Sequence, residues 1–178
     1  MRFAFVAAIF ALGASALPQP QDVSTDSFGG GGGGGGGNPR CLNDGGANYI
    51  VNSYAKLLEF PQGADFNATA QKLLSNKFIV YSDSINSLSG RPLGQPSYPS
   101  KQAFIAGQAQ TPALPGLKTL EVFHTCNKIA WRWIVTEFGT RTAEIKAFIQ
   151  LDVDPAKLQI DQVFSEFNTI AFAANIPK

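Results

Sequence analysis

The pattern of apolar and polar positions changes at Pro115. Before it, apolar residues recur every three or four positions, which is the period of an amphipathic helix. This period predicts three helices, over about residues 43–60, 65–75 and 101–110. Pro61 ends the first helix and Ser100 caps the third. Tyr54 falls on the apolar stripe of the first helix.

Beyond Pro115 apolar and polar residues alternate, which is the period of a β-strand with one buried face. Four strands are predicted, over residues 117–126, 129–138, 143–152 and 158–168, and a short one within residues 77–84. A two-residue hairpin loop at residues 127–128 would place His124 opposite Trp131. The more apolar parity of each strand should face the core, and these inward positions include His124, Cys126, Trp131, Trp133, Phe164 and Glu166.

Helices followed by an antiparallel meander predict an α+β fold, with the helices packed on one face of the sheet. We expect the sheet to curl around the helices to hide Trp131 and Trp133. Tryptophan is too large to bury easily, and its N–H needs a partner. Two indoles on one strand face therefore indicate either the wall of an aromatic cavity or plain core packing.

Three regions differ in composition along the chain. Residues 1–16 have the basic start, the apolar run and the small residues of a secretory signal peptide, so we expect an extracellular protein. Residues 17–37 end in nine glycines, Gly29 to Gly37, and predict a flexible linker. Residues 38–178 have the length of one domain. The apolar run of the signal peptide is shorter than the roughly 20 apolar residues of a membrane helix, and no later stretch comes close to that length.

Secretion bears on two further features. Cys41 and Cys126 are the only cysteines and are predicted to form a disulfide, with two buried thiols as the alternative. Asn67 begins the sequon Asn67-Ala68-Thr69 and is a candidate glycosylation site.

Charge and motifs argue against several classes of function. The chain has 14 Lys and Arg, 13 Asp and Glu, and a net charge of +1, without a run of like charge. Such a surface predicts no nucleic-acid or membrane partner. The sequence has no cluster of metal-ligating residues, no phosphate-binding glycine loop and no serine elbow, so we expect neither a metal nor a cofactor.

The order of the elements resembles the nuclear transport factor two-like superfamily of cone-shaped α+β barrels, including its secreted fungal members. Residues 53–58, 80–83 and 164–168 resemble segments of its ketosteroid isomerases. That resemblance implies that Tyr54 donates a hydrogen bond to an enolate and that Asp83 moves a proton. Where those isomerases carry a second acid, this chain has Ala147, so we do not expect steroid isomerisation.

Three functions remain open. The leading expectation is a small-molecule-binding domain with an apolar or polycyclic ligand between the first helix and the sheet. The first alternative is a cofactor-free isomerase, lyase or cyclase with Asp83 as base and Tyr54 as oxyanion donor; His124 is a further catalytic candidate. The second is a protein-interaction module that forms a homodimer through its sheet. The residues expected to contact the ligand are Tyr81, Trp131, Trp133, Phe164 and Glu166.

Overall fold

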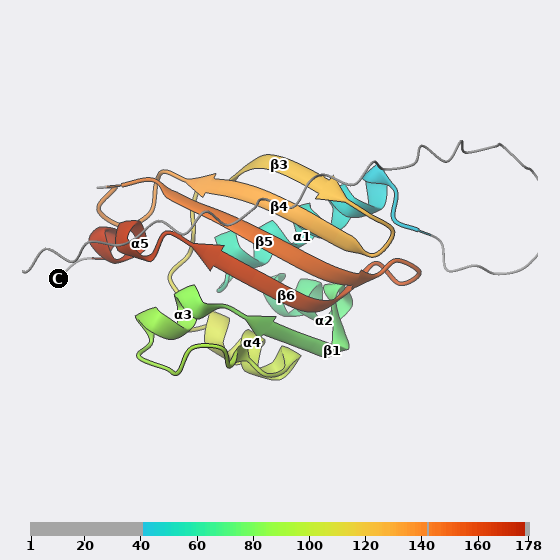
Figure 1. Ribbon diagram of the computed structural model, residues 1–178, viewed down its shortest axis with the longest axis horizontal. Coiled ribbons are helices and arrows are strands. Elements are labelled where there is room, and N and C mark those ends of the chain that lie inside the picture. Colours follow the sequence, from blue (N-terminus) through green and yellow to red (C-terminus); the bar gives the residue numbers. More distant parts are fainter. Residues whose placement is uncertain (1–40, 142, 177–178) are drawn as a thin grey trace, which may run out of the picture. The chain divides into compact units, whose positions relative to one another are not determined.

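The computed structural model describes residues 41–141 and 143–176. The predicted signal peptide and linker lie outside these residues. The described residues form five helices and six strands (Figure 1). In chain order these are α1 (Asp44–Glu59), α2 (Phe66–Leu73), β1 (Leu74–Tyr81), α3 (Asp83–Leu88), β2 (Pro96–Tyr98), α4 (Lys101–Gln108), β3 (Lys118–His124), β4 (Lys128–Val135), β5 (Ile145–Asp154), β6 (Gln159–Phe167) and α5 (Thr169–Asn175).

The three predicted helices are present, within two residues of their expected ends. Helix α1 begins after Asn43, whose side-chain oxygen accepts a hydrogen bond from the Gly46 N–H at 2.8 Å. It ends at the residue before Phe60, since Pro61 cannot continue it. Ser100 caps α4 by accepting a hydrogen bond from the Ala103 N–H. The α+β class is therefore confirmed. None of the described helices is long and apolar enough to cross a membrane.

The sheet has the strand order β2-β1-β6-β5-β4-β3 and does not close into a barrel. The predicted meander β3 to β6 is antiparallel throughout. The prediction of a wholly antiparallel sheet is wrong in one place, because β1 pairs with β6 in parallel. Helix α2 runs directly into β1 at Leu74, and the helix fixes the direction in which that strand enters the sheet.

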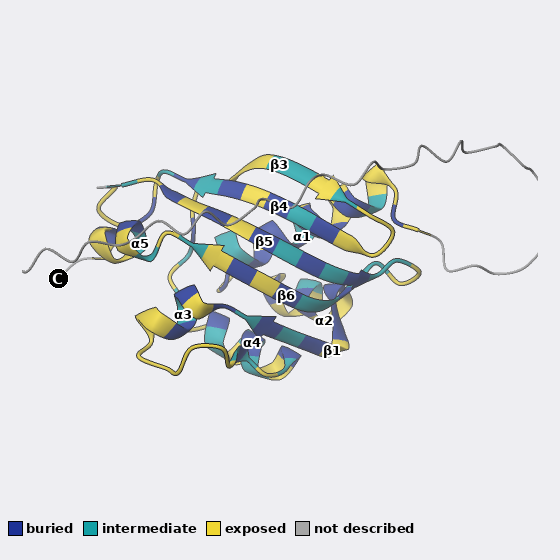
Figure 2. Cartoon of the chain, in the orientation of Figure 1, coloured by how far each residue is buried: buried dark blue, intermediate teal, exposed yellow. Residues whose placement is uncertain are grey.

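The helices cover one face of the sheet. Figure 1 shows α1 and α2 behind strands β4 to β6, and Figure 2 shows buried and exposed residues alternating along these strands. The predicted parity of β4 and β5 is confirmed: Trp131, Trp133, Ile145 and Ile149 are buried. On β6 Ile160 is inward as predicted, but beyond it the buried positions are Val163 and Ser165, which is the parity opposite to the predicted one. A shift of register between Asp152 and Val153 changes the parity of β6.

The β3–β4 hairpin is offset from its predicted register. His124 pairs with Ile129 and Val122 with Trp131, so the predicted pairing of His124 with Trp131 is wrong by two residues. The turn spans residues 125–128 and is closed by a hydrogen bond from the Thr125 N–H to the Lys128 carbonyl at 2.9 Å. An offset of two residues preserves the predicted parity of Val122 and His124, whereas a further shift of register between Thr119 and Glu121 changes the parity of the earlier part of β3.

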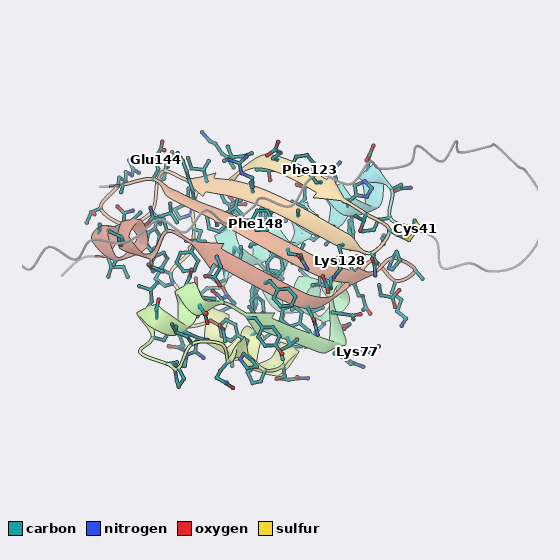
Figure 3. The ribbon with its side chains drawn as sticks, viewed as in Figure 1. Cys41, Lys77, Phe123, Lys128, Glu144 and Phe148 are labelled. Atoms are coloured by element: carbon teal, nitrogen blue, oxygen red, sulfur yellow. A yellow bond between two sulfur atoms is a disulfide. The ribbon has the colours of Figure 1, made fainter. Side chains whose placement is uncertain are left out.

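The predicted disulfide is present and joins Cys41 to Cys126, across 85 residues of sequence. Both cysteines are exposed. Cys41 precedes α1 (Figure 3), and Cys126 lies in the hairpin turn rather than on the inner face of the sheet. The Leu42 N–H donates to the Cys126 carbonyl at 3.0 Å beside it. The bridge therefore fixes the start of α1 to the β3–β4 turn.

Three short elements were not predicted from the sequence: α3, β2 and α5. Helix α5 packs against the β4–β5 hairpin, where Gly139 has φ of +55° and lies so close that a Cβ would stand 1.9 Å from the Asn175 carbonyl oxygen. Asn175 in turn donates from its side-chain amide to the Ala143 carbonyl at 2.7 Å. These elements are too short to show a period of apolar residues in the sequence. They form one end of the cavity described next.

Candidate functional site

A cavity of about 240 Å³ lies between the inner face of the sheet and helices α1, α3 and α4. Its deeper wall includes Tyr54, Phe104 and Trp133, and Leu88 and Phe172 belong to its α3 and α5 sides. None of the described residues that line it carries a carboxylate, amine, guanidinium or imidazole group. The site is thus an apolar pocket with uncharged polar groups, a common composition for small-molecule sites.

Tyr54 sits in the pocket wall because it lies on the buried stripe of α1. Its ring stacks on Phe104 at a centroid distance of 6.0 Å and meets Trp131 edge-on at 6.5 Å. Burial, and secondarily Tyr98, raises the pKa of the Tyr54 hydroxyl far above its ordinary value. The phenol therefore stays neutral at physiological pH.

The two tryptophans of β4 have different surroundings, although both are buried. Trp131 is fully buried under the helices, and its N–H donates to the Thr119 hydroxyl at 3.0 Å. Trp133 is 3% exposed and lines the cavity, and its N–H has no hydrogen-bond partner among the described residues. One indole is therefore core and the other is pocket wall.

Asp83 and Glu166 lie together, outside the described lining of the cavity. The Glu166 carboxylate accepts from the backbone N–H groups of Asp83 at 2.8 Å and Ser84 at 2.9 Å, and from the Ser84 hydroxyl. The Asp83 carboxylate accepts from the Gly94 N–H at 2.7 Å. These contacts tie the start of α3 to β6 and to the following loop. Both carboxylates thereby position α3, whose Leu88 lines the cavity.

The remaining predicted site residues are distributed over the surface. Tyr81 and Phe164 stack on each other at 5.4 Å, and Phe164 is 40% exposed, on the face of the sheet away from the helices. His124 binds the Asp44 carboxylate at 2.9 Å beside the start of α1. Asn67 is exposed on α2. The structure thus brings Tyr54 and the two indoles together.

Several lining residues were not predicted from the sequence. Phe104 and Gln108 come from α4, and Tyr98 from β2. Tyr98 packs against α4 at Gly107, where a Cβ would stand 2.3 Å from the tyrosine ring. The glycine at an inward position of a helix was the one available signal of this close approach. Among the described residues, no group of three or more His, Cys, Asp and Glu could hold a metal ion.

Comparison with known proteins agrees with this architecture. The family model of the NTF2-like domain (nuclear transport factor two-like) matches residues 40–178. The chain belongs to the NTF2-like family. No curated protein sequence matches this NTF2-like chain.

Solved structures share the fold at low sequence identity. A protein of Catenulispora acidiphila with a ketosteroid isomerase-like fold, solved with trimethylamine, is 12% identical with a TM-score of 0.54, over 72% of this chain and 93% of its own. A protein of Jannaschia sp. CCS1 proposed to be a SnoaL-like polyketide cyclase is 11% identical with a TM-score of 0.53, over 77% and 99%. At such identities the similarity shows the fold of this NTF2-like domain alone.

Proposed function

We propose that this NTF2-like domain binds a small, uncharged and mostly apolar molecule in the cavity between α1 and the sheet. The observation that carries the proposal is the composition of the described lining, which is apolar and aromatic with a few neutral polar groups. Burying a neutral amide or hydroxyl there without a partner would cost about 2 to 7 kcal/mol, and burying an unpaired charged group would cost far more. The site therefore favours neutral ligands.

We further propose that the domain acts outside the cell. The signal-peptide pattern of residues 1–16 supports secretion. The Cys41–Cys126 disulfide is consistent with an oxidising compartment. Immunodetection of the chain in culture medium, with an amino-terminal sequence beginning near residue 17, would test it.

The positions of the acidic groups favour binding over proton transfer. A general base must reach the proton that it removes. The Asp83 carboxylate instead holds the loop at Gly94, and the Glu166 carboxylate holds the start of α3. The isomerase, lyase or cyclase alternative would require a movement of α3 that brings Asp83 into the cavity. Turnover that an Asp83→Asn variant loses, with ligand binding retained, would support that alternative.

A co-purifying ligand is the direct test of binding. The protein is purified from the medium under native conditions, and extracts are examined by mass spectrometry before and after denaturation. Released compounds are then added back at about 100 times Kd, where binding should raise the free energy of unfolding by about 2.7 kcal/mol. For a domain of this size the melting temperature should rise by about 5 to 10 °C.

Two leucine substitutions on β6 locate the binding site. Ser165→Leu places a larger side chain in the cavity wall and should abolish the thermal shift. Gln162→Leu is the matched control, because it lies on the opposite face of the same strand. An equal shift in both variants would place the ligand outside the cavity.

A second candidate function, self-association through the sheet, is favoured by the outer face. Phe123 is 58% and Phe148 49% exposed there, and both project from the outer face of the sheet in Figure 3. The pairs Arg132–Glu121 at 2.7 Å and Lys128–Asp152 at 2.6 Å place both signs of charge on the same face. A surface with aromatic groups and both charges is suited to pairing with its own copy around a two-fold axis.

Light scattering coupled to size-exclusion chromatography tests this candidate. The wild-type chain should elute as a dimer, and Phe148→Glu should give a monomer. Phe60→Glu is the control, because Phe60 is similarly exposed, at 59%, but lies at the end of α1. A monomeric wild-type protein at high micromolar concentration would rule out dimerisation through this face.

A further inference from the structure

The Trp133 indole N–H is a buried donor without an acceptor in the described protein. The residue is 3% exposed, and its ring forms part of the cavity wall. Buried indole N–H groups normally find a hydrogen-bond partner, since an unpaired donor loses its bond to water on burial. An acceptor for this N–H must therefore come from whatever occupies the cavity.

Trp131 shows that the fold provides such an acceptor where the indole belongs to the core. The two rings lie on the same face of β4 with centroids 6.1 Å apart. Thr119 is the residue opposite Trp133 on β3, yet its hydroxyl accepts from the Trp131 N–H at 3.0 Å. The indole that has an acceptor, Trp131, therefore lies in the core, and the indole without one, Trp133, lines the cavity.

Other residues of the lining also carry uncharged polar groups. Tyr54, Gln108 and Ser165 are 2%, 5% and 8% exposed. Their side chains make no hydrogen bond to the described residues. They come from α1, α4 and β6, so three elements besides β4 contribute uncharged polar groups to one cavity. A ligand with a neutral polar atom would meet several of these groups, whereas a pure hydrocarbon would leave them unpaired.

We propose that Trp133 is the specificity-determining donor of the cavity, and that its indole N–H binds a neutral oxygen acceptor, such as a ketone carbonyl, on an apolar ring molecule. This inference rests on the proposed function. The size of the cavity limits the ring system. An apolar protein cavity of about 150 Å³ holds benzene, so one of about 240 Å³ suits two fused rings.

Matched probes test the inference. α-Tetralone and tetralin share a bicyclic skeleton and differ by one carbonyl oxygen. Their dissociation constants are measured by calorimetry and ligand-detected NMR on the disulfide-bonded chain. One neutral hydrogen bond corresponds to roughly a three- to tenfold change in affinity. Trp133→Phe should therefore reduce the preference for tetralone over tetralin roughly three- to tenfold. Trp131→Phe, the same change on the same strand, should leave the preference unchanged.

Indole NMR gives a second readout that needs no variant with altered packing. The chain has two tryptophans and therefore two indole N–H signals. Tetralone should move the Trp133 proton downfield, tetralin should not, and the Trp131 signal should respond to neither. If Trp133→Phe fails to fold, this experiment on the wild-type chain still tests whether the Trp133 N–H binds the carbonyl oxygen.

The outcomes separate the inference from the function on which it rests. Binding of both probes with an unchanged preference in Trp133→Phe, or with an unmoved Trp133 proton, overturns the inference and leaves the binding function intact. A bound water would then be the partner of the N–H. If neither probe binds, both the inference and the proposed binding function are overturned.

Discussion

Removal of the disulfide gives the most quantitative test of how this chain is held together. The Cys41→Ser, Cys126→Ser double variant opens a covalent loop of 85 residues. The native contacts around the bridge do not depend on the sulfur atoms. The Leu42 N–H still donates to the residue 126 carbonyl, and His124 still binds Asp44. The effect should therefore arise mainly in the unfolded chain.

The size of the effect follows from the loop length. For 85 residues the chain-entropy relation predicts a loss of about 4 to 5 kcal/mol at 25 °C. Domains of this kind have a total free energy of unfolding of about 5 to 15 kcal/mol. The variant should fold, but with much of its stability removed.

Urea denaturation followed by circular dichroism measures the loss. The midpoint should fall, and the slope m should rise because the unfolded chain without its crosslink exposes more surface. Wild-type protein unfolded in dithiothreitol is the control and should match the double variant, which separates the bond from the substituted residues. A native-like variant that loses less than about 1 kcal/mol would refute the entropic account.

Three further predictions follow from single contacts. Tyr54→Phe removes a hydroxyl without a described protein partner, so the free energy of unfolding in urea should change by less than about 0.5 kcal/mol; a loss above about 1.5 kcal/mol would reveal a hidden partner. Gly107→Ala places a Cβ 2.3 Å from the Tyr98 ring, and this overpacking should cost about 1 to 3 kcal/mol and weaken the ligand-induced rise in melting temperature. The hydrogen bond to Asp44 raises the pKa of His124 above its ordinary value, so the stabilisation should be complete below the ordinary pKa and be lost as the pH rises through the raised one. The melting temperature of wild type minus that of His124→Gln should therefore shrink as the pH rises from below the ordinary histidine pKa of about 6.5 to well above it, and a constant difference would contradict the ion pair.

The local elements of this fold were predictable because their signals are local. The caps Asn43 and Ser100 and the breaker Pro61 set the ends of the long helices. Alternation over eight or more residues showed that the indoles of β4 face inward. The pairing of the two cysteines followed from their number and from the signal peptide.

Predictions that depended on pairing between distant segments were less accurate. The offset of the β3–β4 turn and the changed parity of β6 arise from irregular register, which depends on the neighbouring strands. The predicted carboxylate Glu166 lies on the parity that this change turned outward. Asp83 begins a short helix, α3, whose start is held by Glu166, 83 residues further along the chain.

The amino-acid sequence by itself determined the α+β class, the helix ends, the face of β4 that is buried and the disulfide, because each depends on spacing or composition within a short segment. Only the tertiary structure decided which indole is core and which is cavity wall. That choice depends on where the Thr119 hydroxyl lies and on how α3, α4 and α5 close around the sheet. A donor is paired or unpaired according to its neighbours in space, and neighbours far apart in the chain leave no periodic signal.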